Sequence, residues 1–232
     1  MPTKKLIIFV IILFASFSQF VLAKTNNNKS ELTVEADESL EWFEKEKYYL
    51  AKGNVILKKD GVTLKANIIK ADYVFENGEN ILKKIIAKEE VILTKDNTKA
   101  TGQYMTYDLE EKIANISGSF QTFSSPSGYV ESKKIITFDN LNDKAEAEGD
   151  VKIILSNKTI IYADNVKADF EPTNKSLKKA IAKGNVVIEN KTKSRKSRAD
   201  FGVYNSNDEI IQLTGNVVII NQESKLSGSK GI

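Results

Sequence analysis

The sequence predicts an all-β protein: an elongated twisted β-jellyroll or sandwich built from six to seven two-strand repeats of about 32 residues. Three observations support this fold class. A glycine-centred motif recurs along the chain, a second motif interleaves with it, and apolar residues alternate with polar ones around each glycine. Outside the N-terminal segment, no stretch shows convincing helical periodicity.

The first motif places Gly, usually followed by Asn or Asp, between short apolar segments. Its centres lie at 53, 89, 118, 149, 184 and 215, with the clearest copies at 51–57, 147–153, 182–188 and 213–219. A glycine inside a strand predicts a bend or bulge, so we expect each of these strands to turn a corner between two layers. Glu89 replaces the glycine in one copy, which predicts a corner that is gentler or formed differently.

The second motif is a small residue within a strand-like segment, at Ala36, Ala66, Gly102, Ser132, Ala163, Ala199 and Gly228. An acidic or amide residue follows in four copies, as Asp37, Asn67, Asp164 and Asp200. Because these side chains recur with the structural period, we interpret them as turn or ladder residues rather than catalytic ones. Asn77-Gly78, Asp60-Gly61 and the segment 205–208 predict hairpin turns.

Alternation assigns one face of the sheet to the interior. Of the 24 positions two and four residues from the six centres, 23 are apolar, and only Thr122 is not. This period of two is typical of a sheet buried on one side. The predicted inner face comprises Val55, Leu57, Leu64, Ile85, Val91, Leu93, Ile116, Phe120, Val151, Ile153, Val186, Ile188, Leu213, Val217 and Ile219.

The N-terminal segment has a different composition. Lys4 and Lys5 precede an apolar run, and Ala23 ends a small-residue site, which together predict a signal peptide over residues 1–23. A polar tail at 24–30 and a single β domain at 31–232 follow. The alternative is an uncleaved membrane anchor, although the run is short for a span. Cleavage leaves a formal net charge of about +1, which argues against nucleic acid as a partner.

The chain contains no histidine and no cysteine, so the commonest general base and metal ligands are missing. No serine lies in a nucleophile-elbow context, and the sequence predicts a non-enzymatic protein without a cofactor or metal. One basic run, at 191–198, carries both arginines of the chain. Lys193, Arg195 and Arg198 form either a contact for phosphate or another anion, or a solvated hairpin loop that discourages edge aggregation.

The order and spacing of these motifs resemble the LptA/OstA family of periplasmic lipopolysaccharide-transport proteins. The resemblance covers about residues 31–232, and the segments that carry it are 32–37, 51–55, 62–67, 98–108 and 213–217. It implies a periplasmic β-jellyroll whose apolar groove holds lipid A acyl chains of lipopolysaccharide. It further implies head-to-tail assembly and contact with β-jellyroll domains of the inner-membrane and outer-membrane transport machinery.

The sequence departs from the family pattern in two ways. It has more repeats than a compact member needs, and it stops partway through a repeat, which leaves a truncated unit or an open edge strand. Two alternatives stay open: a membrane-anchored or translocon-associated relative with the same fold, like LptC or the N-terminal domain of LptD, and a purely structural β-repeat scaffold.

Overall fold

The computed structural model describes residues 32–192, 194–207 and 210–232, and in these ranges every regular element is a β-strand. The all-β prediction is confirmed. No helix in the described ranges is long and apolar enough to cross a membrane. The predicted signal peptide and polar tail lie outside the described residues. The strands are β1 (Thr33–Glu35), β2 (Ser39–Phe43), β3 (Tyr48–Lys59), β4 (Val62–Glu76), β5 (Glu79–Lys95), β6 (Thr98–Asp108), β7 (Ile113–Ser117), β8 (Gln121–Ser125), β9 (Gly128–Ser132), β10 (Ile135–Asp139), β11 (Lys144–Leu155), β12 (Thr159–Phe170), β13 (Leu177–Asn190), β14 (Arg195–Asn205), β15 (Ile210–Ile220) and β16 (Lys225–Gly231).

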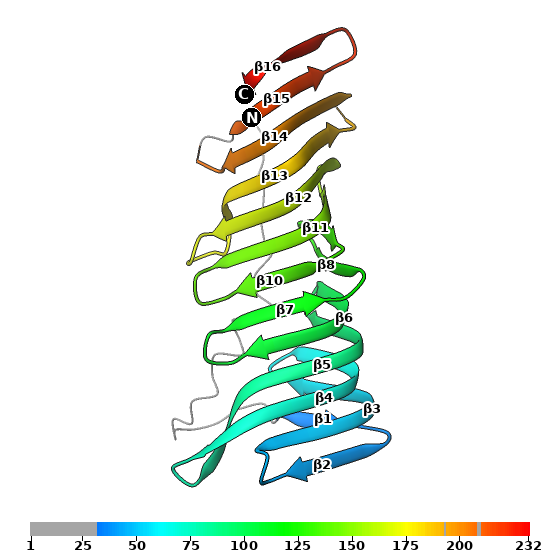
Figure 1. Ribbon diagram of the computed structural model, residues 1–232, viewed down its shortest axis with the longest axis vertical. Helices are drawn as coiled ribbons and strands as arrows, with labels where there is room; N and C mark the ends of the chain where they lie inside the picture. Colours follow the sequence, from blue (N-terminus) through cyan, green and yellow to red (C-terminus); the bar gives the residue numbers. More distant parts are fainter. Residues whose placement is uncertain (1–31, 193, 208–209) are drawn as a thin grey trace.

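The sixteen strands form one antiparallel sheet that follows the order of the chain and is bent along its length (Figure 1). Each long strand crosses from a first layer into a second at a shift in register, as between Lys52 and Val55 of β3. Equivalent shifts occur in β5, β11, β13 and β15. The shifts align into a spine of corners, so the predicted passage of bent strands between two layers is confirmed.

Two residues in the left-handed conformation make each corner. Gly53 and Asn54 have φ of 80° and 43°, and the pair Gly184 and Asn185 has 75° and 48°. Glycine adopts this region without strain, and Asn tolerates it better than most residues, which explains the recurring Gly-Asn motif. Glu89 and Glu90 adopt the same conformation, with φ of 63° and 55°. The prediction of a different or gentler corner at Glu89 is therefore wrong.

The exception lies instead at the centre of the chain. There β6 pairs with two separate strands, β7 in the first layer and β8 in the second. In the same way β11 pairs with β10 and with β9. Gly118 lies in the break between β7 and β8 with φ of 145°, outside the two-residue pattern of the other corners. The chain thus replaces one bent strand on each side of its midpoint by two short strands.

Polar side chains of the second motif bond to the corners. Asn54 donates to Asp37 at 2.9 Å, and Asn216 donates to Asp200 at 2.8 Å. Asn185 donates to Asp164, and Asn67 donates to Glu89 at 2.9 Å. The predicted ladder role of these residues is confirmed. Glu89 therefore occupies the position of the motif glycine and still forms the side-chain hydrogen bond that joins neighbouring strands at the corner.

The strands turn back at two rims. The first rim joins first-layer ends through residues 43–48, 76–79, 108–113, 139–144, 170–177 and 205–207; the second joins second-layer ends through 59–62, 95–98, 125–128, 155–159, 190–192, 194–195 and 220–225. Figure 1 shows these hairpins on opposite sides of the molecule. Asp60-Gly61 and Asn77-Gly78 have positive φ at both positions, as two-residue hairpin turns require.

Candidate functional site

The predicted inner face is largely the interior of the bent sheet. Eleven of its residues are buried: Val55, Leu57, Leu64, Ile85, Val91, Leu93, Ile116, Val151, Val186, Leu213 and Val217. Ile153, Ile188 and Ile219 are partly buried and pack against the same core residues. Alternation therefore found the correct face along most of the chain.

Phe120 is wrong as an inner-face residue. It lies between β7 and β8, and 48% of its surface is exposed. The buried positions of β8 are Gln121 and Phe123, one residue further along the chain. The break at Gly118 shifts the register here by one position, and Thr122, the single polar exception in the sequence pattern, is the sign of that shift.

The first half of the sandwich is filled. Its largest fully buried side chains include Tyr107, Met105, Leu64 and Leu93, and Val55 has no exposed surface at all. Tyr107 is buried deeply enough that desolvation raises its pKa to about 12, with a smaller contribution from the charge of Asp108. The predicted groove is therefore closed by side chains over this half of the molecule.

The second half contains a cavity of about 340 Å³ between the two layers. Ile153, Ile161 and Ile188 line it on the second layer, and small residues face them on the first layer. These small residues are Ala145, Ala147, Ala168, Ala180, Ala182 and Gly202. Because alanine and glycine fill little volume at inner positions, the two layers leave space that larger side chains occupy in the first half.

The cavity has two unlike ends. Toward the first rim its wall is aromatic and aliphatic, with Phe170, Leu177 and Tyr204. Toward the second rim the lining residues are mostly of polar type, namely Ser125, Ser127, Ser156, Asn157 and Thr159, although the wall as a whole presents mainly apolar surface to the cavity. The volume lies within the range of small-molecule pockets, and the mostly apolar wall suits a hydrocarbon ligand with a polar end.

Two further aromatic residues border the cavity. Tyr129 of β9 borders it at the second rim, but Tyr129 is paired with Ile154 and Ser124 and so lies on the face opposite Val130; its pKa is raised by burial and by the nearby charge of Glu131. Phe123 of β8 also lines it and lies against Phe138, with ring centroids 5.2 Å apart. The period-two pattern of 121, 123 and 130, 132 is the available signal, but the centre at Gly118 is one residue out of register with β8, and no glycine centre marks β9.

The basic run does not form the predicted three-residue contact. Arg195 and Arg198 are both exposed but lie on opposite faces of β14, because inner positions alternate there with Ser197 and Ala199 buried. Lys193 lies outside the described residues. Arg195 is paired with Asn190 across the strands and so shares the inner face, whereas Arg198 lies on the outer face.

No group of three or more acidic, histidine or cysteine side chains that could hold a metal ion occurs within the described ranges.

Exposed aromatic residues gather at the N-terminal edge of the sheet. Trp42 of β2 is 57% exposed, donates to the hydroxyl of Tyr73 at 2.7 Å, and stacks on Tyr49 with ring centroids 6.2 Å apart.

Comparison with known families decides the relationship of this chain. The profile of the family described as LptA/(LptD N-terminal domain) LPS transport protein matches twice, at residues 33–138 and 129–231. The chain belongs to this family. The two matches follow one another along the sheet, which explains why the chain has more repeats than one unit of the LptA/LptD N-terminal family needs.

The two family units share their junction. The matched ranges overlap at 129–138, which spans β9 and β10, the short strands at the centre of the sheet. The filled half of the sandwich lies in the first unit, and the cavity is lined mainly by the second unit, with Phe123, Ser125, Ser127 and Gly128 contributed by the first. We therefore call residues 33–138 the first unit and residues 129–231 the second unit.

Part of the chain is also similar to solved structures. The chain is similar to the crystal structure of LptH, described as the LptA homologous periplasmic component of the conserved lipopolysaccharide transport device from Pseudomonas aeruginosa. The two are 16% identical, the alignment covers 47% of this chain and 76% of LptH, and the TM-score is 0.40. A comparison with curated proteins gave no match.

Proposed function

We propose that this protein is a periplasmic, non-enzymatic carrier of lipopolysaccharide that holds acyl chains in the cavity of its second unit. The observation that carries the proposal is the apolar cavity of about 340 Å³ between the layers of a chain from a lipopolysaccharide-transport family. An acyl chain of about a dozen methylenes costs on the order of 10 kcal/mol to expose to water, so transit between membranes requires an apolar enclosure.

The two units have different roles in this proposal. The first unit has a filled interior, with Val55, Leu64 and Leu93 fully buried, and it acts as a structural segment of the carrier. The second unit offers open volume beside Ile153 and Ile188 and takes the lipid. The scaffold alternative is thus favoured for the first unit alone.

The two ends of the sheet support assembly with other β-jellyroll domains of the transport machinery or with a second copy, head to tail. Among the described strands, β1 and β2 at one end pair only with β3, and β16 at the other end pairs only with β15. Both ends expose apolar side chains, including Leu40 and Trp42 on β2 and Leu226 on β16. Unpaired edges with apolar surface favour addition of a partner strand.

Photocrosslinking tests the lipid site. Benzoylphenylalanine at Ile188, on the cavity wall, should capture lipopolysaccharide, whereas the same group at Val187, on the opposite face of β13, should not. Equal capture at the two neighbouring positions would overturn the assignment of the cavity as the lipid site.

A cavity-filling variant provides a second test of whether the lipid binds in the cavity. Ala182→Leu adds volume where the wall is formed by a methyl group, so bound lipopolysaccharide should fall several-fold while the fold is retained. Val187→Phe adds a side-chain extension of comparable size outside the cavity and serves as the control. Unchanged binding by Ala182→Leu would place the lipid elsewhere.

A further inference from the structure

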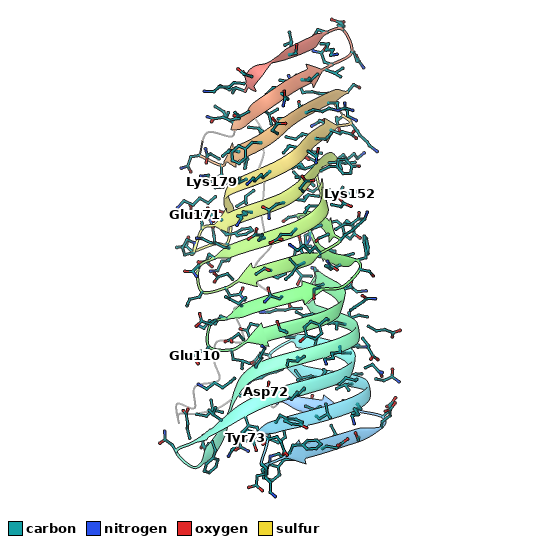
Figure 2. The ribbon with its side chains drawn as sticks, in the orientation of Figure 1. Asp72, Tyr73, Glu110, Lys152, Glu171 and Lys179 are labelled. Atoms are coloured by element: carbon teal, nitrogen blue, oxygen red, sulfur yellow. The ribbon has the colours of Figure 1, made fainter. Side chains whose placement is uncertain are left out.

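The two rims of the sheet carry opposite charge. Over its described residues the first rim has ten acidic side chains and five basic ones, and the second rim has six basic and three acidic. Glu110 and Glu171, both on the first rim, lie along the same side of the molecule in Figure 2. A molecule bound between the rims therefore meets an acidic side and a basic side.

The basic excess of the second rim lies beside the cavity. The turns of the second rim at 125–128, 155–159, 190–192 and 194–195 contain Lys158, Lys191 and Arg195 and, among the described residues, no acid. The three acidic residues of this rim, Asp60, Asp96 and Glu223, lie in other turns, nearer the two ends of the sheet. The described residues of the turns at this end of the cavity therefore carry positive charge and no negative charge.

A row of polar residues connects the cavity wall with these cations. Thr159 lines the cavity, and its hydroxyl accepts a hydrogen bond from the Asn190 side chain at 3.1 Å. Asn190 is paired in turn with Arg195, and residues paired across strands lie on the same face. Arg195 thus stands on the inner face about two strand spacings, or roughly 10 Å, from Thr159.

The side chain of Arg195 also has no polar partner among the described residues. Its side chain is exposed, and no hydrogen bond or ion pair within the described residues engages it, whereas the neighbouring Lys196 pairs with Glu189 at 2.6 Å. A guanidinium presents five N–H donors in a fork that matches two oxygens of a phosphate. The opposite end of the cavity is lined by Phe170 and Leu177, whose side chains offer an anion no hydrogen-bond donor, and the nearby Glu171 is paired with Lys178 at 3.6 Å.

From this geometry we infer that the second rim beside the cavity is a phosphate subsite, with Arg195 as its principal contact and Lys158 in support. The inference rests on the proposed function and extends it, because it fixes the direction of the bound lipid. The phosphorylated headgroup lies at the second rim, and the acyl chain runs from there between the layers toward Phe170 and Tyr204.

The test compares two lipids and two arginines. Binding of diphosphoryl lipid A and of the same lipid after enzymatic removal of its phosphates is measured for the wild type, Arg195→Glu and Arg198→Glu. The two variants change the net charge equally, but Arg198 lies on the outer face. We expect Arg195→Glu to weaken binding of diphosphoryl lipid A about tenfold and to leave the dephosphorylated lipid unaffected. Arg198→Glu should bind both lipids as the wild type does.

Each other outcome has a distinct meaning. If the wild type binds the two lipids equally, the phosphate subsite is wrong and the carrier function stands; if it binds neither, the carrier function itself is wrong. Equal losses in the two arginine variants would reveal a general charge effect and overturn the subsite. Inorganic phosphate that binds alone and abolishes the difference between the lipids would make the rim a site for free anions. Arg195→Gln repeats the test with a neutral, similarly shaped side chain.

Discussion

The side-chain amide of Asn185 donates to both carboxylate oxygens of Asp164, at 3.1 and 3.0 Å. This contact joins neighbouring strands at a corner of the bent sheet and lies directly over Gly184, so that a β-carbon at Gly184 would collide with the Asp164 carboxylate. The glycine, the amide and the acid of the repeat are thus three parts of one device that turns the strand from one layer into the next.

Gly184→Ala should therefore lower the free energy of unfolding by about 2 to 3 kcal/mol, since it combines a left-handed alanine with loss of the Asp164 contact. Gly61→Ala is the control, because Gly61 has a similar φ of 76° but nothing within 4 Å of an added β-carbon. Urea denaturation of both variants checks the difference. Equal losses would mean that the carboxylate contact adds nothing to the corner.

The corner at Glu89 and Glu90 offers a stabilising change. Glu90 occupies the position held elsewhere by Asn54, Asn185 and Asn216, all with φ near that of Glu90. Asn tolerates the left-handed region better than Glu, so Glu90→Asn should raise the free energy of unfolding by about 0.5 kcal/mol. A lower urea midpoint for this variant would contradict the account of the corners. Glu89 is left in place because it accepts the hydrogen bond from Asn67.

Gln121 is a second site for stabilisation. The residue has no exposed surface, and neither of its amide atoms has a hydrogen-bond partner in the described structure. An unpaired buried amide is costly, so Gln121→Met, which keeps the volume, should raise the free energy of unfolding by about 1 to 2 kcal/mol. Gln222→Met, at an exposed turn, should have no effect. Destabilisation by Gln121→Met would indicate that the amide binds a group inside the sandwich.

Stability should fall at alkaline pH because of Tyr107. Its pKa is raised from 10.0 to about 12, so the unfolded chain loses this phenolic proton at lower pH than the folded chain. Between pH 10 and 12 the unfolded state binds fewer protons, and the contribution of Tyr107 to stability, complete below pH 10, is lost. Tyr107→Phe should show a shallower fall over this range, by up to about 2 kcal/mol. Urea midpoints across the range measure it, and parallel curves would refute the assignment.

Sequence alone predicted the architecture because the corners are local. Glycine with asparagine at a fixed spacing reports a backbone conformation, and alternation around it reports which side is buried, so both could be read without knowing what lies opposite. Glu89 misled because its backbone conformation is enforced by the neighbouring strands rather than by its own preference. Phe120 misled because the break at Gly118 moves the register by one residue.

The cavity could not be predicted in the same way. It depends on the small residues Ala145, Ala182 and Gly202 of the first layer facing the second layer across the sandwich, and alternation does not show which inner residues are opposite each other. The sequence therefore treated Val55 and Ile188 as equivalent, whereas one is fully buried in a filled core and the other borders open volume. The face on which Arg195 lies likewise follows from the burial of Ser197 and Ala199 in β14, which the basic run itself does not predict.

Because the two family units share β9 and β10, the inner surface of one molecule runs through both units without a break in the chain. Two separate domains placed end to end form a joint that dissociates on dilution and loses translational freedom each time it forms. Here the joint is covalent, because residues 129–138 belong to both family units. The alignment of one unit with the next is therefore independent of protein concentration, and dilution does not separate the units.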